Sequence, residues 1–255
     1  MRVRLTLSAL RREAELPLDY QYAVASLLYA ALGRDSEEFA TRLHDEGFSA
    51  DGRTFRLFTF SRLETRRAEA AGDRLVLIDP TVSLHVSSPV TEFIEHLVAG
   101  LSRSGFLRLA SAPFRLESAE LLPPPAFAPV MRFRALSPVT ESVDEGGRHA
   151  RFLDPGDDWS EVVRGNLLRK HQALYGKGPQ DTRLRWEWDT QYLAEVRGRG
   201  RRTSVLAEIS GVKVRGWLVP FTVRGSEELI RMGYEAGFGS RNSMGFGMAE
   251  AVRVR

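Results

Sequence analysis

Histidine is the residue type in this chain best suited to move a proton near neutral pH, because the imidazole pKa lies close to neutrality. The 255 residues include five histidines and no cysteine. Without cysteine, the chain has no thiolate nucleophile, disulfide, thiolate-bound zinc or iron–sulfur cluster. No two histidines lie three or four residues apart, the spacing that places a metal-binding pair on one helix face. We therefore expect no metal site on these histidines and no cofactor.

His44 is the best placed of the five for acid–base work. It stands at the end of a predicted helix over 36–45, which begins at Ser36, a favourable N-cap residue, and it shortly precedes Gly47. A loop at this point can expose the ring. Taken alone, the position is more often that of a surface or capping histidine, which the helix dipole favours near a C-terminus.

The most distinctive pattern is a doubled Gly-Phe-Gly loop over 237–247, with five residues between the two triplets. Successive N–H groups in such a loop can cradle phosphate oxygens, and glycine lets the backbone approach a ligand closely. The alternative is a tight turn whose phenylalanines are anchored in the core. Dinucleotide-binding loops follow a strand and open a helix, whereas here a helix precedes and a strand follows. The candidate phosphate-binding residues are Gly237, Gly239, Ser240, Arg241, Asn242, Gly245 and Gly247.

Positive charge collects in the second half of the chain. The net charge is only +3, but residues 128–255 hold 21 bases against 16 acids. Arginine offers a planar donor fork that suits phosphate. A solvated loop that promotes solubility is the alternative interpretation. The bases concentrate at 197–215, where six of them face only Glu208: Arg197, Arg199, Arg201, Arg202, Lys213 and Arg215.

The elements that must position these residues repeat once along the chain. Hydrophobic periodicity predicts the order β, α, β, β, α, β in each half, with one additional helix in the first. The first half has predicted strands over 2–8, 54–63, 74–86 and 114–122, and helices over 18–32, 36–45 and 89–103. The second has predicted strands over 130–137 and 248–254, strand-rich segments over 183–196 and 204–223, and helices over 157–175 and 226–236.

A stiff run of three prolines, 123–125, marks the boundary between the halves. An Arg-x-Arg pattern followed by Leu-Ser begins both halves, 130 residues apart. The order βαββαβ is that of the ferredoxin-like unit. We therefore predict an α+β protein of two tandem ferredoxin-like, RRM-like domains, residues 1–122 and 127–255.

Composition sets the broad class. At 43% hydrophobic and 27% charged residues, the chain can bury a core and is not a disordered polymer. No apolar run approaches the roughly 18 residues of a membrane span. The N-terminus begins with an Arg-alternating strand pattern rather than a signal peptide. These features, with the lack of cysteine, predict a cytoplasmic protein without a membrane partner.

The glycine-rich loop before the last strand resembles the signature of the RAMP superfamily. More specifically, the chain resembles the CRISPR-associated endoribonucleases that process precursor CRISPR RNA, the sixth numbered Cas family. The resemblance runs in family order over essentially the whole chain. Four further stretches carry it: Leu27–Leu32 (LLYAAL), Leu43–Phe48 (LHDEGF), Leu57–Ser61 (LFTFS) and Leu136–Val139 (LSPV).

This resemblance implies metal-independent cleavage of CRISPR repeat RNA by attack of a ribose 2′-hydroxyl, leaving a 2′,3′-cyclic phosphate and a 5′-hydroxyl. The resemblance places His44 in the acid–base role and Tyr29 as its partner. Tyr20 and Tyr22 are rivals of Tyr29 on the same segment. Many relatives have a lysine where this chain has Arg56. Arg53 is the alternative candidate for the same role. Arginine can stabilise transition-state charge but cannot act as a base near neutral pH, so an electrostatic role is expected.

The resemblance also names partners. We expect precursor CRISPR RNA to bind the second half, with the 197–202 loop contacting phosphates. Lys213 and Arg215, two apart on a predicted strand, share one face. Contacts with CRISPR effector subunits, and a homodimer, are left open. The alternative function is a non-catalytic RNA-binding RAMP subunit of a CRISPR ribonucleoprotein, which the glycine-rich loop and the basic patch would fit equally well.

Overall fold

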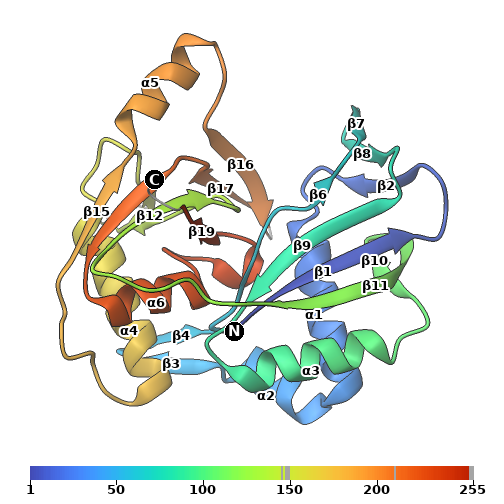
Figure 1. Cartoon of the computed structure of the whole chain (residues 1–255), viewed down its shortest axis with the longest axis horizontal. Coiled ribbons are helices and arrows are strands. Elements are labelled where there is room, and N and C mark those ends of the chain that lie inside the picture. The colour runs from blue at the N-terminus through green and yellow to red at the C-terminus, as the bar shows by residue number, and fades with distance from the viewer. Residues whose placement is uncertain (145, 147–149, 210, 253–255) are drawn as a thin grey trace.

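The computed structural model describes residues 1–144, 146, 150–209 and 211–252. Two antiparallel sheets stand side by side, with helices packed against each (Figure 1). Segment 123–129, which contains the three prolines, carries the chain from one sheet to the other. The fold is therefore a mixed α/β architecture built on two antiparallel sheets.

The first sheet has the strand order β10-β11-β1-β9-β5, with β6 also paired to β9. Its strands are β1 (Arg2–Ala9), β5 (Thr59–Phe60), β6 (Glu64–Thr65), β9 (Thr81–Ser87), β10 (Leu107–Leu109) and β11 (Ala112–Leu122). Strand β1 alternates as predicted: Val3, Leu5 and Leu7 are buried. Three helices accompany this sheet: α1 (Gln21–Asp35), α2 (Glu37–Asp45) and α3 (Thr91–Ser102).

Helices α1 and α3 approach each other very closely. A Cβ atom at Gly100 would stand 1.8 Å from the carbonyl oxygen of Ala31, so only glycine fits there. Helix α2 begins as predicted, because Ser36 accepts a hydrogen bond from the N–H of Phe39 at 3.2 Å. This cap fixes the start of the helix whose last turn carries His44.

The second sheet has the order β15-β18-β12-β19. Its strands are β12 (Val130–Ala135), β15 (Leu184–Trp188), β18 (Phe221–Gly225) and β19 (Ala249–Ala251), accompanied by α4 (Ser160–Tyr175) and α6 (Glu227–Ala236). Aromatic rings fill its core: Trp186 stacks on Phe221 with centroids 3.9 Å apart, and Phe238 packs edge-on against Phe221. Strands β1 and β12, which carry the repeated Arg-x-Arg pattern, each pair with two neighbours inside their sheet.

Smaller elements surround the two sheets. A three-stranded sheet joins β2 (Ala14–Pro17), β8 (Arg74–Leu77) and β7 (Ala68–Ala71). Short pairs join β3 (Phe48–Ala50) to β4 (Arg53–Phe55) and β13 (Ser142–Val143) to β14 (Arg151–Phe152). A longer arm follows β15, made of helix α5 (Thr190–Gly198) and the hairpin β16 (Ser204–Ile209) with β17 (Val212–Trp217). The glycine-rich loop contains a single 3₁₀ turn, η1 (Asn242–Met244).

Four predicted elements need correction. The strand in the segment over 183–196 ends at Trp188, and the rest is helix α5, because Asp189 caps it by accepting from the N–H of Tyr192. The strand over 54–63 is broken at Leu57, whose φ of +48° is incompatible with a strand. The strand over 74–86 divides into β8 and β9, which belong to different sheets. The strand-rich segment over 204–223, which counts as one strand in the predicted order, contains three: β16, β17 and β18.

Other boundaries shift by a few residues. The helix predicted over 18–32 is α1 at 21–35. The last strand, predicted over 248–254, is β19 at 249–251, and residues 253 and 254 lie outside the described part. No helix in the described ranges has the length and apolarity that crossing a membrane requires.

Buried polar contacts join the two halves. The guanidinium of Arg2 donates to the carbonyls of Tyr234 at 2.8 Å and Ala249 at 2.9 Å, and it lies 3.7 Å from the centre of the Tyr234 ring. The hydroxyl of Thr59 donates to the carbonyl of Phe246 at 2.9 Å. The second contact ties the Phe-Thr-Phe-Ser segment directly to the glycine-rich loop.

Candidate active site

A cavity of about 570 Å³ lies where the two halves meet. Tyr29 of α1, His44 of α2 and strand β4 contribute from the first half, while α4 and residues 240–244 contribute from the second. Its charged lining is basic, and no aspartate or glutamate is among the described residues that form it. The bases are Arg53, Arg56, Lys170 and Arg241, beside His44. Such a lining favours an anionic ligand.

His44 presents an accessible ring in this cavity. Its side chain is 69% exposed at the end of α2, as the sequence predicted. The Nδ1 atom lies 2.8 Å from Oδ1 of Asp45. Because a carboxylate only accepts hydrogen bonds, this contact assigns the proton to Nδ1 in the neutral ring and leaves the Nε2 lone pair free.

Tyr29 contacts His44 directly. The two rings meet edge to face, with centroids 5.4 Å apart and planes at 81°. Phe58 also packs edge to face against the Tyr29 ring, with centroids 5.7 Å apart. Burial raises the pKa of the Tyr29 phenol, and the hydrogen-bonded guanidinium of Arg56 offsets this only in part. The phenol is therefore protonated at neutral pH and can donate a hydrogen bond. Of the predicted rivals, Tyr22 is 63% exposed, while the buried Tyr20 accepts from the N–H of Leu63, and neither lines the cavity.

Arg56 connects the two predicted catalytic residues. Its Nη2 donates to the carbonyl oxygen of His44, and its guanidinium also bonds the Tyr29 phenol. The close turn at Gly47 makes room for it: at φ +57°, a Cβ atom there would stand 2.5 Å from Nη1 of Arg56. Arg56 thus holds the end of α2 against α1. Arg53, its predicted rival, lines the same cavity and is exposed.

The glycine-rich loop is held by a buried ammonium group that the sequence analysis did not select. Lys170 of α4 is 2% exposed, and its Nζ donates to the carbonyls of Gly237 and Gly239, each at 2.8 Å. Its third hydrogen goes to Oδ1 of Asn242 at 2.7 Å. The amide nitrogen of Asn242 donates in turn to the carbonyls of Phe238 and Phe246. Every side-chain donor and acceptor of this clamp is satisfied.

Some of the predicted phosphate-binding residues are used inside the loop, and others remain available to a ligand. Phe238 and Phe246 are fully buried, as expected of core anchors, and the Asn242 side chain is used inside the loop. Ser240 donates its N–H and hydroxyl to the carbonyl of Thr140. Arg241 is exposed. Within the described residues, no acceptor is recorded for the backbone N–H groups of residues 241–243.

Glu141 shares the buried site with Lys170. It is 4% exposed, and burial raises the pKa of its carboxyl to about 7, while burial lowers the pKa of Lys170 to about 7. Their mutual attraction offsets only part of the desolvation of each charge. The three acceptors around Nζ match the three hydrogens of an ammonium, which supports the charged form of Lys170.

The predicted basic patch lies elsewhere. Figure 1 shows α5 at the top of the view, the β16–β17 hairpin below it and α2 at the bottom. Arg215 approaches Asp154 at 3.7 Å, and Lys213 shares its exposed strand face, as predicted. None of the six predicted bases lines the His44 cavity, and all six are exposed: Arg197, Arg199, Arg201, Arg202, Lys213 and Arg215.

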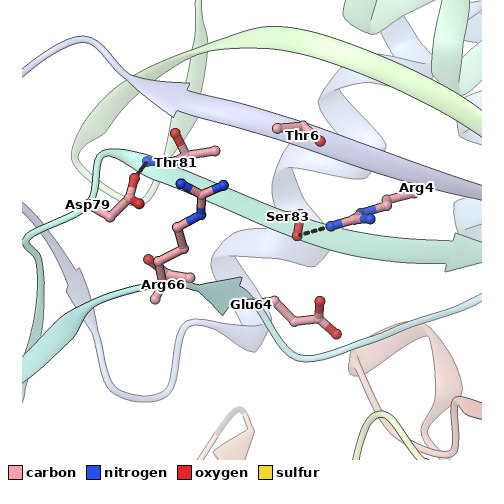
Figure 2. Close-up of a pocket in the computed structure, with 8 residues that line it drawn as sticks. Arg4, Thr6, Glu64, Arg66, Asp79, Thr81 and Ser83 are labelled. Carbon is pink, nitrogen blue, oxygen red and sulfur yellow. Dashed lines mark hydrogen bonds between the residues drawn. The ribbon is translucent and has the colours of Figure 1, made fainter.

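A second hollow, of about 490 Å³, lies on the first sheet (Figure 2). Arg4 and Arg66 extend across it, but Glu64 and Asp79 lie in the same hollow. Asp79 accepts from the N–H of Thr81 at 2.8 Å. Because acids and bases are mixed here, this surface is less selective for an anion than the cavity around His44.

Sequence reasoning missed the α4 wall of the cavity. Lys170, Asn166 and the nearby Glu141 are far from His44 in sequence and belong to no local motif. The rarity of two residue types could have pointed to this wall. Lys170 is one of only three lysines in a chain rich in arginine, and Asn166 is one of only two asparagines, the other being Asn242. Both asparagines and this lysine line the cavity.

The arrangement combines three chemical capacities in one place. An imidazole with a free nitrogen can accept a proton, and a protonated phenol can donate a hydrogen bond. Guanidinium groups and backbone N–H groups can stabilise negative charge. In the described ranges, no group of three or more metal-ligating side chains is found.

Comparison with known proteins places this arrangement in a family. Residues 15–120 match the family described as CRISPR-associated protein Cas6, N-terminal, and residues 122–251 match CRISPR associated protein Cas6, C-terminal. The CRISPR-associated endoribonuclease Cas6 1 of Methanocaldococcus jannaschii is 31% identical, over 93% of this chain and 87% of its own length. The CRISPR-associated endoribonuclease Cas6 of Pyrococcus furiosus is 26% identical, over 97% of this chain and 88% of its own.

Solved structures of Cas6 proteins have the same fold as this chain. A structure of a CRISPR associated protein Cas6 superposes with a TM-score of 0.78 at 30% identity, covering 99% of both chains. The product of a Cas6-related gene from Pyrococcus furiosus has the same fold, with a TM-score of 0.83 at 24% identity, covering 100% of this chain and 99% of its own. The chain belongs to the Cas6 family.

Proposed function

We propose that this protein is a metal-independent endoribonuclease that cleaves CRISPR repeat RNA by attack of a ribose 2′-hydroxyl on the adjacent phosphate. The observation that carries the proposal is that His44 and the glycine-rich loop, from opposite halves of the chain, line one cavity whose charged groups are basic. Relatives named as Cas6 endoribonucleases support the reaction class.

In the proposed reaction, Nε2 of His44 accepts the proton of the 2′-hydroxyl. The hydroxyl oxygen then bonds to phosphorus as the bond to the 5′-oxygen breaks. The 5′-oxygen takes up a proton from water, and the protonated His44 returns its proton to the solvent. Tyr29 donates a hydrogen bond to the reacting group, since burial keeps its phenol protonated. Positioned acid–base groups contribute about 10²–10⁴-fold each. The products are a 2′,3′-cyclic phosphate and a 5′-hydroxyl.

Arg56 has a positioning and electrostatic role in this proposal. Its hydrogen bonds to the His44 carbonyl and the Tyr29 phenol fix the two rings relative to each other. Its charge, with those of Arg53 and Arg241, counters the charge that develops on the phosphorane. The backbone N–H groups of residues 241–243 are further donors for phosphate oxygens.

In this proposal, each half of the chain is one ferredoxin-like domain. The strand orders β11-β1-β9-β5 and β19-β12-β18-β15 both follow the 4-1-3-2 order of a ferredoxin-like unit, which supports two tandem domains at 1–122 and 127–255.

The exposed arginines of the α5 and β16–β17 arm would bind RNA outside the cavity. One chain supplies every residue of the cavity, so the proposed chemistry does not require a homodimer.

End-group analysis tests this proposal. Repeat RNA is incubated with purified protein in EDTA, and the new ends are identified. We expect a 2′,3′-cyclic phosphate and a 5′-hydroxyl, and no cut in RNA with a 2′-deoxy substitution at the cleaved nucleotide. Intact RNA that binds tightly would instead support the alternative, a non-catalytic RNA-binding RAMP subunit, and a 3′-hydroxyl product would contradict the mechanism.

A further inference from the structure

One wall of the cavity carries a buried hydrogen-bond acceptor that has no donor. Asn166 of α4 is 4% exposed and lines the cavity together with His44. Its Oδ1 atom is buried and has no hydrogen-bond partner among the described residues. A buried amide oxygen left unpaired costs about 1–3 kcal/mol, so such groups in native proteins almost always have a partner.

The neighbouring side chains do not supply that partner. Lys170, one turn further along α4, already donates its three hydrogens to Gly237, Gly239 and Asn242. The Nε of Arg169 is likewise buried without an acceptor, so it does not pair with Asn166. No described side chain supplies a donor for this oxygen, so the missing donor has to come from a ligand of the cavity that Asn166 lines.

The chemistry of the missing partner follows from the atom that is free. A phosphate group at neutral pH offers oxygens and would bind the basic groups of the cavity, but it has little to donate to an amide oxygen. A nucleoside does have donors: the ribose 2′-hydroxyl and the exocyclic amines of adenine, guanine and cytosine.

We propose that Asn166 determines substrate specificity by accepting a hydrogen bond from the nucleoside part of a nucleotide next to the scissile phosphate. This inference rests on the proposed function for its substrate class, RNA. It assigns the phosphate to the side of the cavity formed by Arg53, Arg56 and Arg241, and the nucleoside to the α4 wall. The Asn166 amide reads the nucleotide and takes no part in proton transfer.

The test is a binding experiment in which both sides of the hydrogen bond are altered. Repeat RNAs carry one change each beside the cleavage site: a 2′-deoxy sugar, or a base analogue lacking its exocyclic amine. Dissociation constants are measured for the His44→Ala protein, which we expect to leave the RNA intact, and for His44→Ala with Asn166→Leu. Gln172→Leu, an exposed amide on the same helix, is the matched control.

We expect one modified RNA to bind the Asn166-containing protein about 5- to 30-fold more weakly than unmodified RNA, the usual range for one hydrogen bond. Asn166→Leu should bind both RNAs with the same reduced affinity, and Asn166→Asp, which keeps an acceptor, should retain the discrimination. Loss in the deoxy RNA identifies the sugar as the donor, and loss in the base analogue identifies the amine.

Equal binding of all modified RNAs by the protein with Asn166 would overturn the inference, and this result does not depend on how the variants fold. So would unchanged affinity in Asn166→Leu, which would mean that a water molecule satisfies the oxygen. The outcome is separate from the proposed reaction: a wild-type protein that binds but does not cleave would defeat the nuclease and leave the Asn166 contact standing.

Discussion

Tyr29 contacts both the imidazole of His44 and the core of the first half. Its ring packs edge to face against His44 and Phe58, while the hydroxyl is bonded to Arg56. Removing only the oxygen therefore separates chemistry from packing. Tyr29→Phe should lower the single-turnover cleavage rate about 10- to 100-fold, the lower part of the range for one positioned proton donor. Thermal unfolding should change little, because the ring contacts remain.

Tyr22→Phe, at an exposed position of the same helix, is the control. A Tyr29→Phe protein that cleaves at the wild-type rate would remove Tyr29 from the mechanism.

The glycine-rich loop depends on a single buried lysine. Lys170→Met keeps the length of the side chain but leaves the carbonyls of Gly237 and Gly239 and the amide oxygen of Asn242 without a donor. Removing one partner of a buried charged network costs about 3–5 kcal/mol. Urea unfolding should show a loss of that order, whereas Lys177→Met, at an exposed lysine, should stay close to wild type. Equal stability of the two variants would show that the clamp contributes nothing.

Glu141, which is buried near Lys170, makes the stability of the protein depend on pH. Burial raises the pKa of Glu141 to about 7 from an ordinary 4.5, so between these values the folded chain binds a proton that the unfolded chain has released. The free energy of unfolding therefore falls as pH rises through this window. Lys170, whose pKa burial lowers to about 7, adds its own dependence only above it.

Glu141→Gln removes this titration. Between about pH 5 and 6.5, the free energy of unfolding of the wild type should fall relative to the Gln variant by on the order of 1 kcal/mol. Denaturant unfolding across this range measures the difference, with Glu208→Gln, at an exposed strand position, as control. Parallel curves for wild type and Glu141→Gln would contradict the assignment.

At the level of elements, local patterns predicted what local interactions determine. The alternation of Val3, Leu5 and Leu7 and the cap at Ser36 are properties of neighbouring residues, and both are confirmed. Helix α5 lies in a segment predicted to be strand-rich, because Trp186 and Trp188 alternate up to Asp189, where a cap interaction starts a helix. Leu57 adopts a left-handed backbone in the middle of a predicted strand, and no local signal marks it.

Over the whole molecule, the two halves are joined by a few buried polar contacts. Arg2 supplies two of them, to Tyr234 and Ala249, and it lines no part of the His44 cavity. Arg2→Met should lower the free energy of unfolding by about 2–4 kcal/mol, because a buried charged donor and two carbonyl partners are affected. Below the unfolding transition, single-turnover cleavage should stay within about threefold of wild type. Arg11→Met, at an exposed position, provides the comparison. Unchanged stability would mean that Arg2 does not hold the halves together.

The candidate site shows how far sequence alone could reach. His44, Tyr29 and Arg56 lie within 28 residues and carry a family pattern, so they could be selected from the chain. The wall formed by Asn166 and Lys170 could not, because it comes to His44 through long-range packing, in which the β3–β4 hairpin lies against α4. The sequence indicates a role for the backbone of the glycine-rich loop, and the structure gives its asparagine an internal role as well.

The central claim is that the accessible imidazole of His44 moves a proton during metal-independent RNA cleavage. It is tested most directly by single-turnover cleavage of repeat RNA in EDTA, at saturating protein, by wild type, His44→Ala and His96→Ala. His96 is the matched control, since its ring bonds Asp35 on α1 and lies outside the cavity. The account predicts a fall of at least about 100-fold for His44→Ala, with RNA affinity within about threefold of wild type, and near-wild-type cleavage for His96→Ala. Cleavage by His44→Ala at the wild-type rate would contradict it.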